Sequence, residues 1–459
     1  MAASPVRDGS PVTRSHDVTR RQVVRGAAIV GGALMLPRTG RAFADDRSPT
    51  PPVPATRRDA RVPLAWFDAC QELLRDTPGY SPPVASRALA YLGVSLYEAI
   101  VPGMPGFKSL QGELTGLDHL PRPPSRALDW DAVANAALET AVRRFFPGAN
   151  ADHQRTVDRL AEALMPAASA RTVRSAQYGS QVADAVYRWS TTDGGHLGHQ
   201  RNFPSDYVPP TGPGRWEPTP PEYQPAMQPT WGDNRTFVLP SSGSCAPPPP
   251  TPFSSSPEST FYAEALEVYR AVNRRTPEQE AIAQFWSDDP AMTSTPPGHA
   301  ISILSQVLAD RDASLAEAAE AYAKVGVSLG DAFIACWATK YRHHLVRPVT
   351  FIHDHIDTTW MPILGTPPFP EYTSGHSVQS AAACTVMADL FGDQTSFVDH
   401  THDDRGLSPR AFSSFSSCAD EAAISRLYGG IHYRPAIDLG VDQGRCIGRR
   451  VGELPTRPR

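Results

Sequence analysis

The sequence predicts an all-α protein with long loops. Along most of its 459 residues, apolar side chains recur at helical spacing, which is the pattern of amphipathic helices. Strand-like alternation of apolar and polar residues is scarce. The chain also contains 47 prolines, and because proline interrupts helices, long connections between them are expected. A chain of this length can bury a large core.

In the N-terminal half, five helices are predicted. The first carries apolar residues at Leu64, Phe67, Leu73 and Leu74, and Pro83 suits the first turn of the second. The predicted ranges are Val62–Arg75, Pro83–Ile100, Trp130–Phe146, Asp152–Leu164 and Thr172–Trp189.

A long break follows, from Thr191 to Phe253, and it is rich in proline, glycine and aromatic residues. Loops of this length are usually functional or disordered. Its interspersed aromatic residues, Trp216, Tyr223 and Trp231, favour an ordered segment that packs on the helices and shapes the mouth of a site. A flexible insertion is the alternative.

Helices resume after this break. Pro348 is expected to end the helix that begins at Leu315, because the residue before a proline is disfavoured in the helical conformation. If that helix extends far enough, Lys340 and Arg347, seven residues apart, share one side of it. The predicted ranges are Ser259–Asn273, Pro277–Ser287, His299–Leu308, Leu315–His344, Ser374–Phe391, a helix from Asp420, and Ala436–Arg450.

The most informative stretch is Phe369–Ser377, with the sequence FPEYTSGHS. Prolines before it forbid a helix, and the Ala-rich run after it favours one that starts near Ser374. A helix N-terminus offers free N–H groups and a positive dipole end to an oxyanion, and Gly375 would let the backbone approach that anion closely. His376 would then lie beside the bound group. Taken alone, the tripeptide Ser-Gly-His also fits a capped helix with a surface histidine.

Two flanking blocks strengthen the functional interpretation. Lys340 and Arg347-Pro348 precede the turn, and Ser425-Arg426 and His432 follow it. Three cations, a helix N-terminus and two histidines together describe a site for a tetrahedral or trigonal-bipyramidal oxyanion.

In order and separation, these three blocks resemble the signature of the type-2 phosphatidic acid phosphatase and vanadium haloperoxidase superfamily. The departure within them is Thr373, where the family usually has proline. The resemblance covers residues 331–451 well and implies an α-helical bundle with the site at one end.

The resemblance also implies residue roles. Lys340, Arg347 and Arg426 would bind the equatorial oxygens, helped by Ser374 and the N–H of Gly375. His432 would be the protein ligand of vanadate in a haloperoxidase, which oxidises halide with hydrogen peroxide and halogenates small organic substrates. In the alternative, a secreted acid phosphatase, His432 would carry a phosphohistidine. His376 would act at the opposite apex as acid or base, and Lys340 would polarise bound peroxide.

Three further residues resemble those of fungal-type chloroperoxidases. Trp337 and Phe369 would line a halide pocket, although Trp337 also fits core packing. Asp331 would orient the cationic pair Lys340 and Arg347. The family often has an aspartate four residues after the distal histidine, but Ala436 stands there, so either Asp438 or a backbone carbonyl is expected to hold His432.

Two non-vanadate alternatives stay open. One is a divalent metal site built from His343-His344 and the segment His353–Asp357, with His400 and His402 expected in a polar surface loop. The other is an oxyanion-binding helical protein without activity.

The remaining predictions concern the chain as a whole. The net charge of −5 without a long basic run does not favour nucleic-acid binding. The sequence contains no run of 18 apolar residues, so no membrane span is predicted.

Residues 1–44 resemble a twin-arginine export signal, with Arg20-Arg21 and an Ala42-Phe43-Ala44 cleavage site, so the protein is expected in the periplasm or outside the cell. Residues 45–60 would be a linker and 61–459 one domain. Six cysteines allow 15 pairings; Cys336 and Cys384 are expected as buried thiols.

Overall fold

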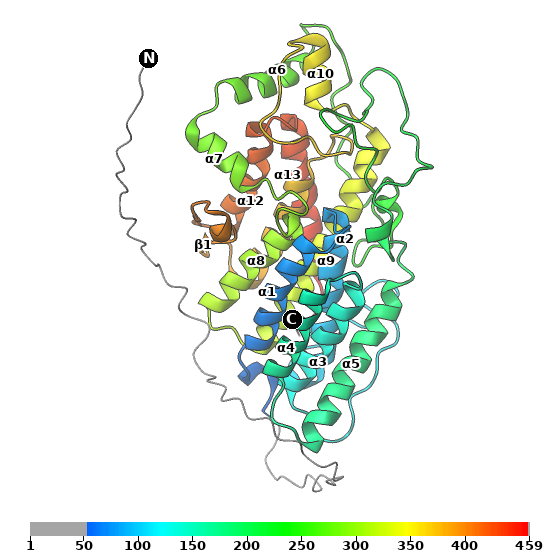
Figure 1. The fold of residues 1–459 in the computed structure, drawn as a ribbon, viewed down its shortest axis with the longest axis vertical. Helices are drawn as coiled ribbons and strands as arrows, with labels where there is room; N and C mark the ends of the chain where they lie inside the picture. Colours follow the sequence, from blue (N-terminus) through cyan, green and yellow to red (C-terminus); the bar gives the residue numbers. More distant parts are fainter. Residues whose placement is uncertain (1–52, 458–459) are drawn as a thin grey trace, which may run out of the picture. The chain divides into compact units, whose positions relative to one another are not determined.

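The structure of the chain is a computed structural model that describes residues 53–457. The predicted export signal and most of the predicted linker lie outside the described residues. The all-α prediction is confirmed, since helices account for nearly all the regular structure (Figure 1). The α-helices are α1 (Arg61–Asp76), α2 (Pro82–Ile100), α3 (Trp130–Phe145), α4 (Ala151–Leu164), α5 (Ala170–Ser190), α6 (Thr260–Asn273), α7 (Pro277–Phe285), α8 (Thr295–Asp310), α9 (Leu315–His343), α10 (Pro348–His355), α11 (Gly375–Phe391), α12 (Phe415–Tyr428) and α13 (Arg434–Gly452).

Local sequence explains where many of these helices begin. The hydroxyl of Ser314 accepts the N–H of Glu317, and the Glu317 carboxylate accepts the N–H of Ser314, which is a capping box at the start of α9. Asn150 and Ser259 cap α4 and α6 through their side chains in the same position. These caps satisfy N–H groups that the first turn of a helix would leave without partners.

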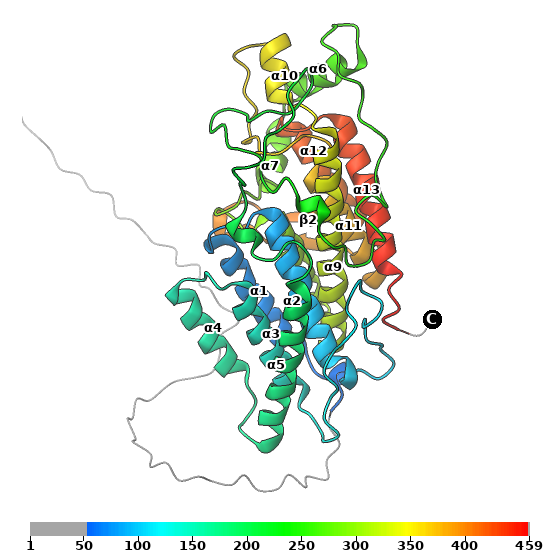
Figure 2. The same cartoon turned by 90° about the vertical axis from the view of Figure 1, so that its right-hand side faces the viewer.

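Two helix pairs form the centre of the bundle, α2 with α9 and α11 with α13. Figures 1 and 2 show α2 beside α9, Figure 2 shows α11 beside α13, and α9 also packs against α11. Small residues allow the close approach. A Cβ added at Gly93 of α2 would lie 2.3 Å from the Tyr322 carbonyl oxygen, and one added at Gly444 of α13 would lie 2.2 Å from that of Val378. Only glycine therefore fits at these two crossings.

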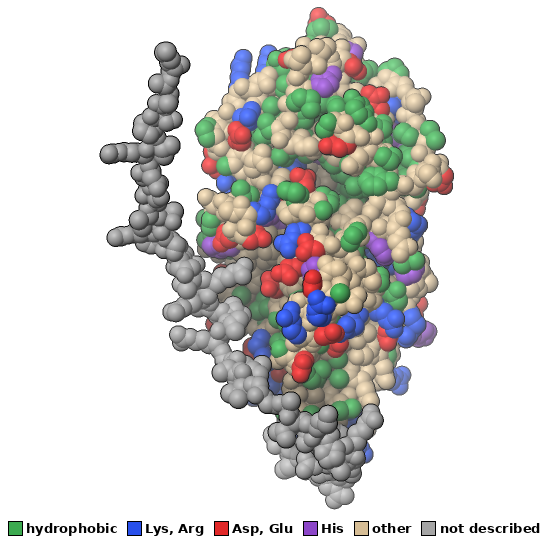
Figure 3. All heavy atoms as spheres, in the orientation of Figure 1, with side chains coloured by type: hydrophobic (Ala, Val, Ile, Leu, Met, Phe, Trp, Pro, Cys, Tyr) green, Lys and Arg blue, Asp and Glu red, His purple; other side chains and the backbone are tan. Residues whose placement is uncertain are grey.

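Helix α2, with the turn that follows it, is long and apolar enough to cross a membrane. The whole apolar window is buried within the protein, as in the core helix of a globular bundle. On the face drawn in Figure 3, acidic and basic side chains are interspersed, and no large patch of one sign is visible.

The structure corrects the predictions around Pro348. Helix α9 ends at His343, and His344 adopts a left-handed conformation with φ 49°. Pro348 begins the new helix α10, because proline is well suited to the first turn, and Arg347 is the residue before it. Lys340 and Arg347 therefore lie on different elements and do not share one helix.

Two smaller corrections concern residues 397–428. Strands β1 (Phe397–Asp399) and β2 (Arg410–Phe412) form an unpredicted antiparallel hairpin, with Phe397 opposite Phe412. Helix α12 begins at Phe415 and not at Asp420, because Ser414 and Ser417 cap it. The serine-rich residues 413–417 have the composition of a loop, which explains why the predicted start was too late.

The long segment 191–253 is ordered, as predicted. It contains only the short 3-10 helices Gly198–Gln200 and Trp231–Asp233, and Trp216 and Trp231 are buried. The described end of the predicted linker also packs on the body, because Ala55 is buried and the Leu315 N–H donates to the Arg58 carbonyl.

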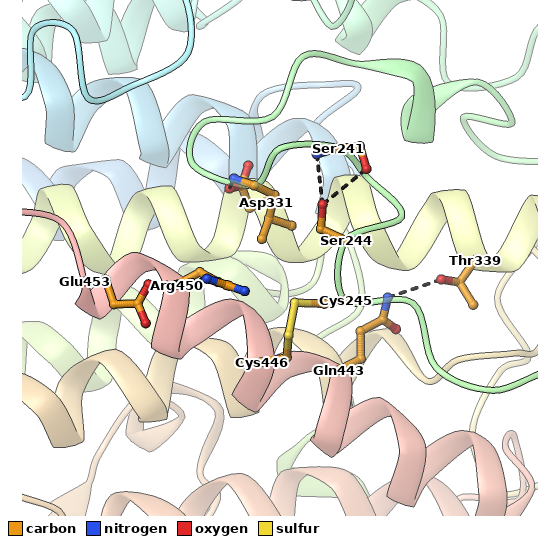
Figure 4. The surroundings of a disulfide bond; sticks show 10 residues. Ser241, Ser244, Cys245, Asp331, Thr339, Gln443, Cys446, Arg450 and Glu453 are labelled. Carbon is orange, nitrogen blue, oxygen red and sulfur yellow. Dashed lines mark hydrogen bonds and ion pairs between the residues drawn. A yellow bond between two sulfur atoms is a disulfide. The ribbon is translucent and has the colours of Figure 1, made fainter.

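A disulfide joins Cys245 in this segment to Cys446 in α13 (Figure 4). The sequence left the pairing open. The other four cysteines are free and buried, which confirms the prediction for Cys336 and Cys384.

Candidate active site

A cavity of about 740 Å³ opens at the N-terminus of α11. We call it the site cavity. Several predicted site residues line it, and they come from α9, the turn before α11, α11 itself, α12 and the segment after α12: Trp337, Phe369, Gly375, His376, Arg426 and His432. Lys340, Arg347 and Ser374 are fully buried directly behind this wall. The fold therefore brings together blocks that are up to about 90 residues apart in the sequence.

The imidazole of His432 is held by Glu371. Nδ1 of His432 lies 2.9 Å from Oε1 of Glu371, and the same oxygen accepts the Tyr433 N–H at 2.8 Å. The prediction that Asp438 or a backbone carbonyl holds His432 is wrong, since Asp438 is exposed on α13. Glu371 reaches the imidazole because the turn before α11 folds under the segment that carries His432. The sequence signal that could have identified Glu371 is its position inside the FPEYTSGHS stretch.

The other ring nitrogen of His432 faces the site. Because Glu371 accepts from Nδ1–H, Nε2 carries the lone pair, and it lies 3.2 Å from Nη1 of Arg347. Burial, with the charges of Arg347, Lys340 and Arg426, holds the pKa of His432 well below its usual value. A neutral imidazole whose Nε2 lone pair accepts only a hydrogen bond from Arg347 can become a metal ligand or a nucleophile when that bond is exchanged.

Arg347 is anchored by backbone oxygens. Its Nε donates to the Phe369 carbonyl at 2.9 Å and its Nη1 to the Ile431 carbonyl at 2.8 Å. Arg426 donates from Nε to the hydroxyl of Ser425 at 2.8 Å and from Nη2 to the Ala283 carbonyl at 3.2 Å. Burial lowers the pKa of each guanidinium to about 10, so both remain charged at neutral pH.

Lys340 is turned toward the backbone of the turn before α11. Its Nζ donates to the carbonyls of Pro370, Glu371 and Thr373 at 3.0, 3.1 and 2.5 Å. All three N–H donors of an ammonium group are thereby used. Its predicted contact with an oxyanion stays a prediction, because it would require exchanging a carbonyl partner. In this structure Lys340 fixes the turn that carries Glu371 and Ser374.

The charge balance of the site suits an anion. Three cations, Lys340, Arg347 and Arg426, are buried here. Glu371 acts on the first two, and Asp288 and Asp289 act on Arg426. None of the three cations forms a direct ion pair with a carboxylate within residues 53–457. Buried cations without anionic partners are unfavourable, so a bound oxyanion would offset the cost.

The N-terminus of α11 leaves room for such a group. A Cβ added at Gly375 would meet only the Trp337 ring, at 3.8 Å, so the protein itself does not require glycine there. The space lies on the cavity side, where an anion would approach the helix N-terminus. The Ser374 hydroxyl accepts the Ser377 N–H at 3.3 Å and retains its own proton to donate.

His376 also has unused hydrogen-bonding capacity. Its Nε2 is buried and has no partner among the described residues. Burial and the nearby charge of Arg426 hold the pKa of His376 well below its usual value, so the ring is neutral. A neutral imidazole that lines the cavity can accept a proton from a bound hydroxyl or peroxide.

Trp337 and Phe369 form an aromatic wall. Their ring centroids are 4.9 Å apart, and Lys340 Nζ and Arg347 Cζ each lie 4.9 Å from the Phe369 centroid. The Trp337 indole N–H donates to the Met227 carbonyl at 3.3 Å and ties the wall to the long segment 191–253. Trp337 is almost fully buried, so it serves the core as well as the cavity.

Asp331 does not orient Lys340 and Arg347, which corrects the prediction. Its carboxylate accepts the N–H groups of Phe237, Val238 and Leu239 at 2.6, 2.9 and 3.0 Å. Burial raises the pKa of Asp331 to about 6, while the three N–H donors oppose that rise. Asp331 therefore stabilises the long segment 191–253 and not the cations.

A second cluster of ionisable groups escaped the sequence analysis. His299 donates from Nδ1 to Asp288 at 2.9 Å and from Nε2 to Asp399 at 2.8 Å, and His402 Nε2 lies 3.1 Å from Asp288. His402 is buried here and not on the surface as expected, whereas His400 is half exposed. These residues come from the loop after α7, from α8, from β1 and from the loop after β1, and no motif connects them in the sequence.

Asp288, His299 and His402 could offer one ligand atom each to a metal ion. The predicted alternative around His343–Asp357 does not form such a group within residues 53–457. Burial would by itself lower the pKa of His299, but Asp288 and Asp399 raise it to about 10. A doubly protonated ring between two carboxylates satisfies every hydrogen bond of the cluster without an ion.

The buried ammonium predicts a pH dependence. Burial lowers the pKa of Lys340 to about 7, so in the free protein its charge is present below pH 7 and is lost above it. Because an anion favours the charged form, vanadate affinity should fall by up to about tenfold per pH unit above 7. Equilibrium dialysis between pH 6 and 9 measures this effect. In Lys340→Met the vanadate species titrate identically but the ammonium is absent, so parallel profiles in the two proteins would contradict the prediction.

Comparisons with known proteins agree with this geometry. Residues 320–457 match the family model of the VCPO second helical-bundle domain. Vanadium chloroperoxidase of Curvularia inaequalis is 26% identical over 402 residues, which cover 71% of this chain. The match spans 64% of the length of that relative.

Solved structures extend the similarity to most of the chain. A bacterial vanadium-dependent chloroperoxidase in its holo form superposes with a TM-score of 0.68 and 17% identity, covering 87% of this chain and 98% of its own, which supports the fold. A bacterial vanadium-dependent iodoperoxidase superposes with a TM-score of 0.80 and 39% identity, covering 87% of this chain and 97% of its own. With this identity and coverage, the chain belongs to the vanadium haloperoxidase family.

Proposed function

We propose that this chain is a vanadium-dependent haloperoxidase that oxidises a halide with hydrogen peroxide to a hypohalous-acid equivalent. The observation that carries the proposal is the pairing of a neutral His432, whose Nε2 lone pair faces the site, with a buried His376 whose Nε2 has no partner among the described residues, beside three buried cations. Iodide is the first halide to test, since a relative 39% identical to this chain is an iodoperoxidase. The overall reaction is H₂O₂ + X⁻ + H⁺ → HOX + H₂O.

Vanadate fits the residues present. His432 would hold it through Nε2, while Arg347 and Arg426 would neutralise its negative charge and Gly375 N–H and Ser374 Oγ would donate to its oxygens. When bound, vanadate supplies a Lewis-acidic centre that activates peroxide toward halide.

The protein's own contribution is orientation and proton transfer. Glu371 fixes the tautomer of His432 and strengthens its Nε2 as a donor of electrons. His376 would take a proton from incoming peroxide and return it as water leaves. The aromatic wall of Trp337 and Phe369 suits a weakly hydrated halide.

The alternative is an acid phosphatase that uses the same residues and forms a phosphohistidine at His432. A paired assay separates the two. One arm supplies orthovanadate, peroxide and iodide or bromide and follows oxidation of the halide; the other omits vanadate and follows hydrolysis of an aryl phosphate. Halide oxidation that depends on vanadate supports the proposal. Phosphate hydrolysis that vanadate inhibits, without halide oxidation, overturns it.

Replacing His376 with alanine should leave vanadate bound but lower turnover by about 10²–10⁴, the usual contribution of a general acid–base group. The reason is that His376 lines the cavity and its Nε2 makes no hydrogen bond to another described residue of the site. Steady-state halide oxidation and vanadate dialysis on the same preparation measure both effects. His400→Ala, which changes a half-exposed histidine outside the cavity, is the matched control. Complete loss of vanadate binding in His376→Ala would show that its role is different.

The proposal extends to location. The twin-arginine-like segment 1–44 would direct export of the protein to the periplasm or the cell exterior. The Cys245–Cys446 disulfide supports this, because such bonds persist in oxidising compartments.

A further inference from the structure

The site cavity is larger than its inorganic reactants require. Peroxide and a halide ion each occupy the volume of a few waters, roughly 30 Å³ apiece in the liquid. The cavity measures about 740 Å³, which lies within the range of pockets that enclose drug-sized organic ligands, roughly 300–1,000 Å³. Most of its volume is therefore available to a third, organic reactant.

The walls of the cavity suit a flat apolar molecule. Aromatic side chains line it, namely Tyr80, Phe203, Phe333, Trp337 and Phe369, and Leu364 and Ile431 add aliphatic surface. Aromatic rings pack favourably against other rings in stacked or edge-on arrangements. The same wall reaches His376 and His432, so a bound ring would lie within the cavity where oxidised halogen is produced.

The charges of the cavity disfavour an anionic molecule. Its charged lining groups are the carboxylates of Asp76, Glu222, Asp288 and Asp289 and the guanidinium groups of Arg75 and Arg426. Arg75 already pairs with Asp76 at 2.7 Å. Asp288 is likewise paired, with His299 at 2.9 Å, which leaves Glu222 and Asp289 as the lining carboxylates without an ion-pair partner within residues 53–457. Beyond the site that holds the oxyanion, the cavity is thus acidic, and cations are also favoured near aromatic faces.

The lining segments are held in fixed, unusual conformations. Asp288 and Ala291 have φ of 47° and 65°, and Tyr223 and Gln228, which flank lining residues of the long segment, both have φ of 50°. Non-glycine residues adopt this region at a cost, and such residues are enriched at functional sites. Asp288 is further fixed by His299 and His402. A preformed pocket of this size favours ligand binding, because little of the protein has to become ordered when the ligand binds.

We propose that the site cavity binds the organic acceptor, an electron-rich aromatic molecule that is neutral or cationic, and that halogenation takes place within the cavity. This inference rests on the proposed haloperoxidase activity. The step is HOX + Ar–H → Ar–X + H₂O, in which the ring carbon forms a bond to halogen, the ring proton leaves, and hydroxide departs from the halogen as water. Halogenation by hypohalite released into bulk solution would not need the cavity.

A competition between two phenols tests the proposal. Tyramine and 4-hydroxyphenylacetate carry similar phenol rings but opposite charges at neutral pH. An equimolar mixture is treated with the enzyme, vanadate, peroxide and halide, and a second mixture at the same pH receives reagent hypohalite slowly. The enzyme should raise the ratio of halogenated tyramine to halogenated 4-hydroxyphenylacetate several-fold above the reagent ratio. Equal ratios would overturn the inference while leaving halide oxidation intact; no halide oxidation at all would instead refute the proposed function.

Two variants locate the effect in the cavity. Gly365 lines it with open space around a Cβ, so Gly365→Phe would fill part of it, and Glu222→Gln would remove an exposed negative charge. Both should move the product ratio toward the reagent value. Because the ratio compares two acceptors in one mixture, it does not depend on how much oxidised halogen each variant makes. Gly243→Phe and Glu217→Gln, which lie outside the cavity lining, are the matched controls and should keep the wild-type ratio. A ratio unchanged in Gly365→Phe and Glu222→Gln would contradict binding in this cavity.

Discussion

Replacing His432 with alanine is expected to abolish vanadate binding and reduce halide oxidation to background. In the structure, the neutral Nε2 of His432 points toward the site, held by Glu371 on one side and flanked by Arg347 on the other. Among the predicted site residues, it is the one whose lone pair a carboxylate fixes toward the buried cations, so no neighbour can replace it as a ligand. Equilibrium dialysis with orthovanadate and a halide-oxidation assay measure the two losses.

Imidazole rescue separates a lost ligand from a damaged fold. The His432→Ala variant leaves a cavity the size of the ring, and added imidazole should restore part of the vanadate binding. His400→Ala, a half-exposed histidine outside the site, should behave as wild type. Retained halide oxidation in His432→Ala, without imidazole, would place the reactive centre elsewhere.

Replacing Glu371 with glutamine is expected to weaken vanadate binding by about 10–100-fold, the usual effect of changing a partner that holds a metal-bound histidine. The amide oxygen can still accept from His432 Nδ1–H and Tyr433 N–H, so the geometry is largely preserved. The negative charge that makes Nε2 a stronger ligand is lost. Vanadate dialysis on the variant measures the change.

Phosphate provides the internal control for this prediction. Phosphate would sit among the same cations, and removal of the negative charge of Glu371 makes their surroundings more positive. Phosphate affinity, measured as the increase in melting temperature, should therefore stay equal or rise while vanadate affinity falls. If both affinities fall together, Glu371 has a structural role only.

The sequence was sufficient for whatever depends on local pattern. Helical spacing of apolar residues placed most helices within a few residues, and the three motif blocks identified several of the residues that line the cavity. His376, Arg426 and His432 could be predicted because each sits at a fixed place within its motif.

Partners chosen by tertiary contact could not be predicted. Glu371 lies 61 residues from His432, and Asp331 accepts from N–H groups 92–94 residues away, so neither contact leaves a periodic signal. The family resemblance suggested the wrong partner for His432, because the family's aspartate lies in the helix that follows this histidine. The second ionisable cluster could not be predicted for the same reason. Its hydrogen bonds join residues 11, 100 and 114 positions apart, which tertiary packing and not a sequence motif brings together: Asp288, His299, Asp399 and His402.

The disulfide has a topological consequence for the site. Cys245 and Cys446 are 201 residues apart, and every residue that binds or faces the proposed oxyanion lies between them. The polypeptide and the S–S bond thus form a covalent ring that carries the complete site. A protease that cuts once anywhere within this ring opens it but releases no fragment. The two halves of the active centre, the turn before α11 and the segment after α12, would remain on one covalent molecule until the disulfide is reduced.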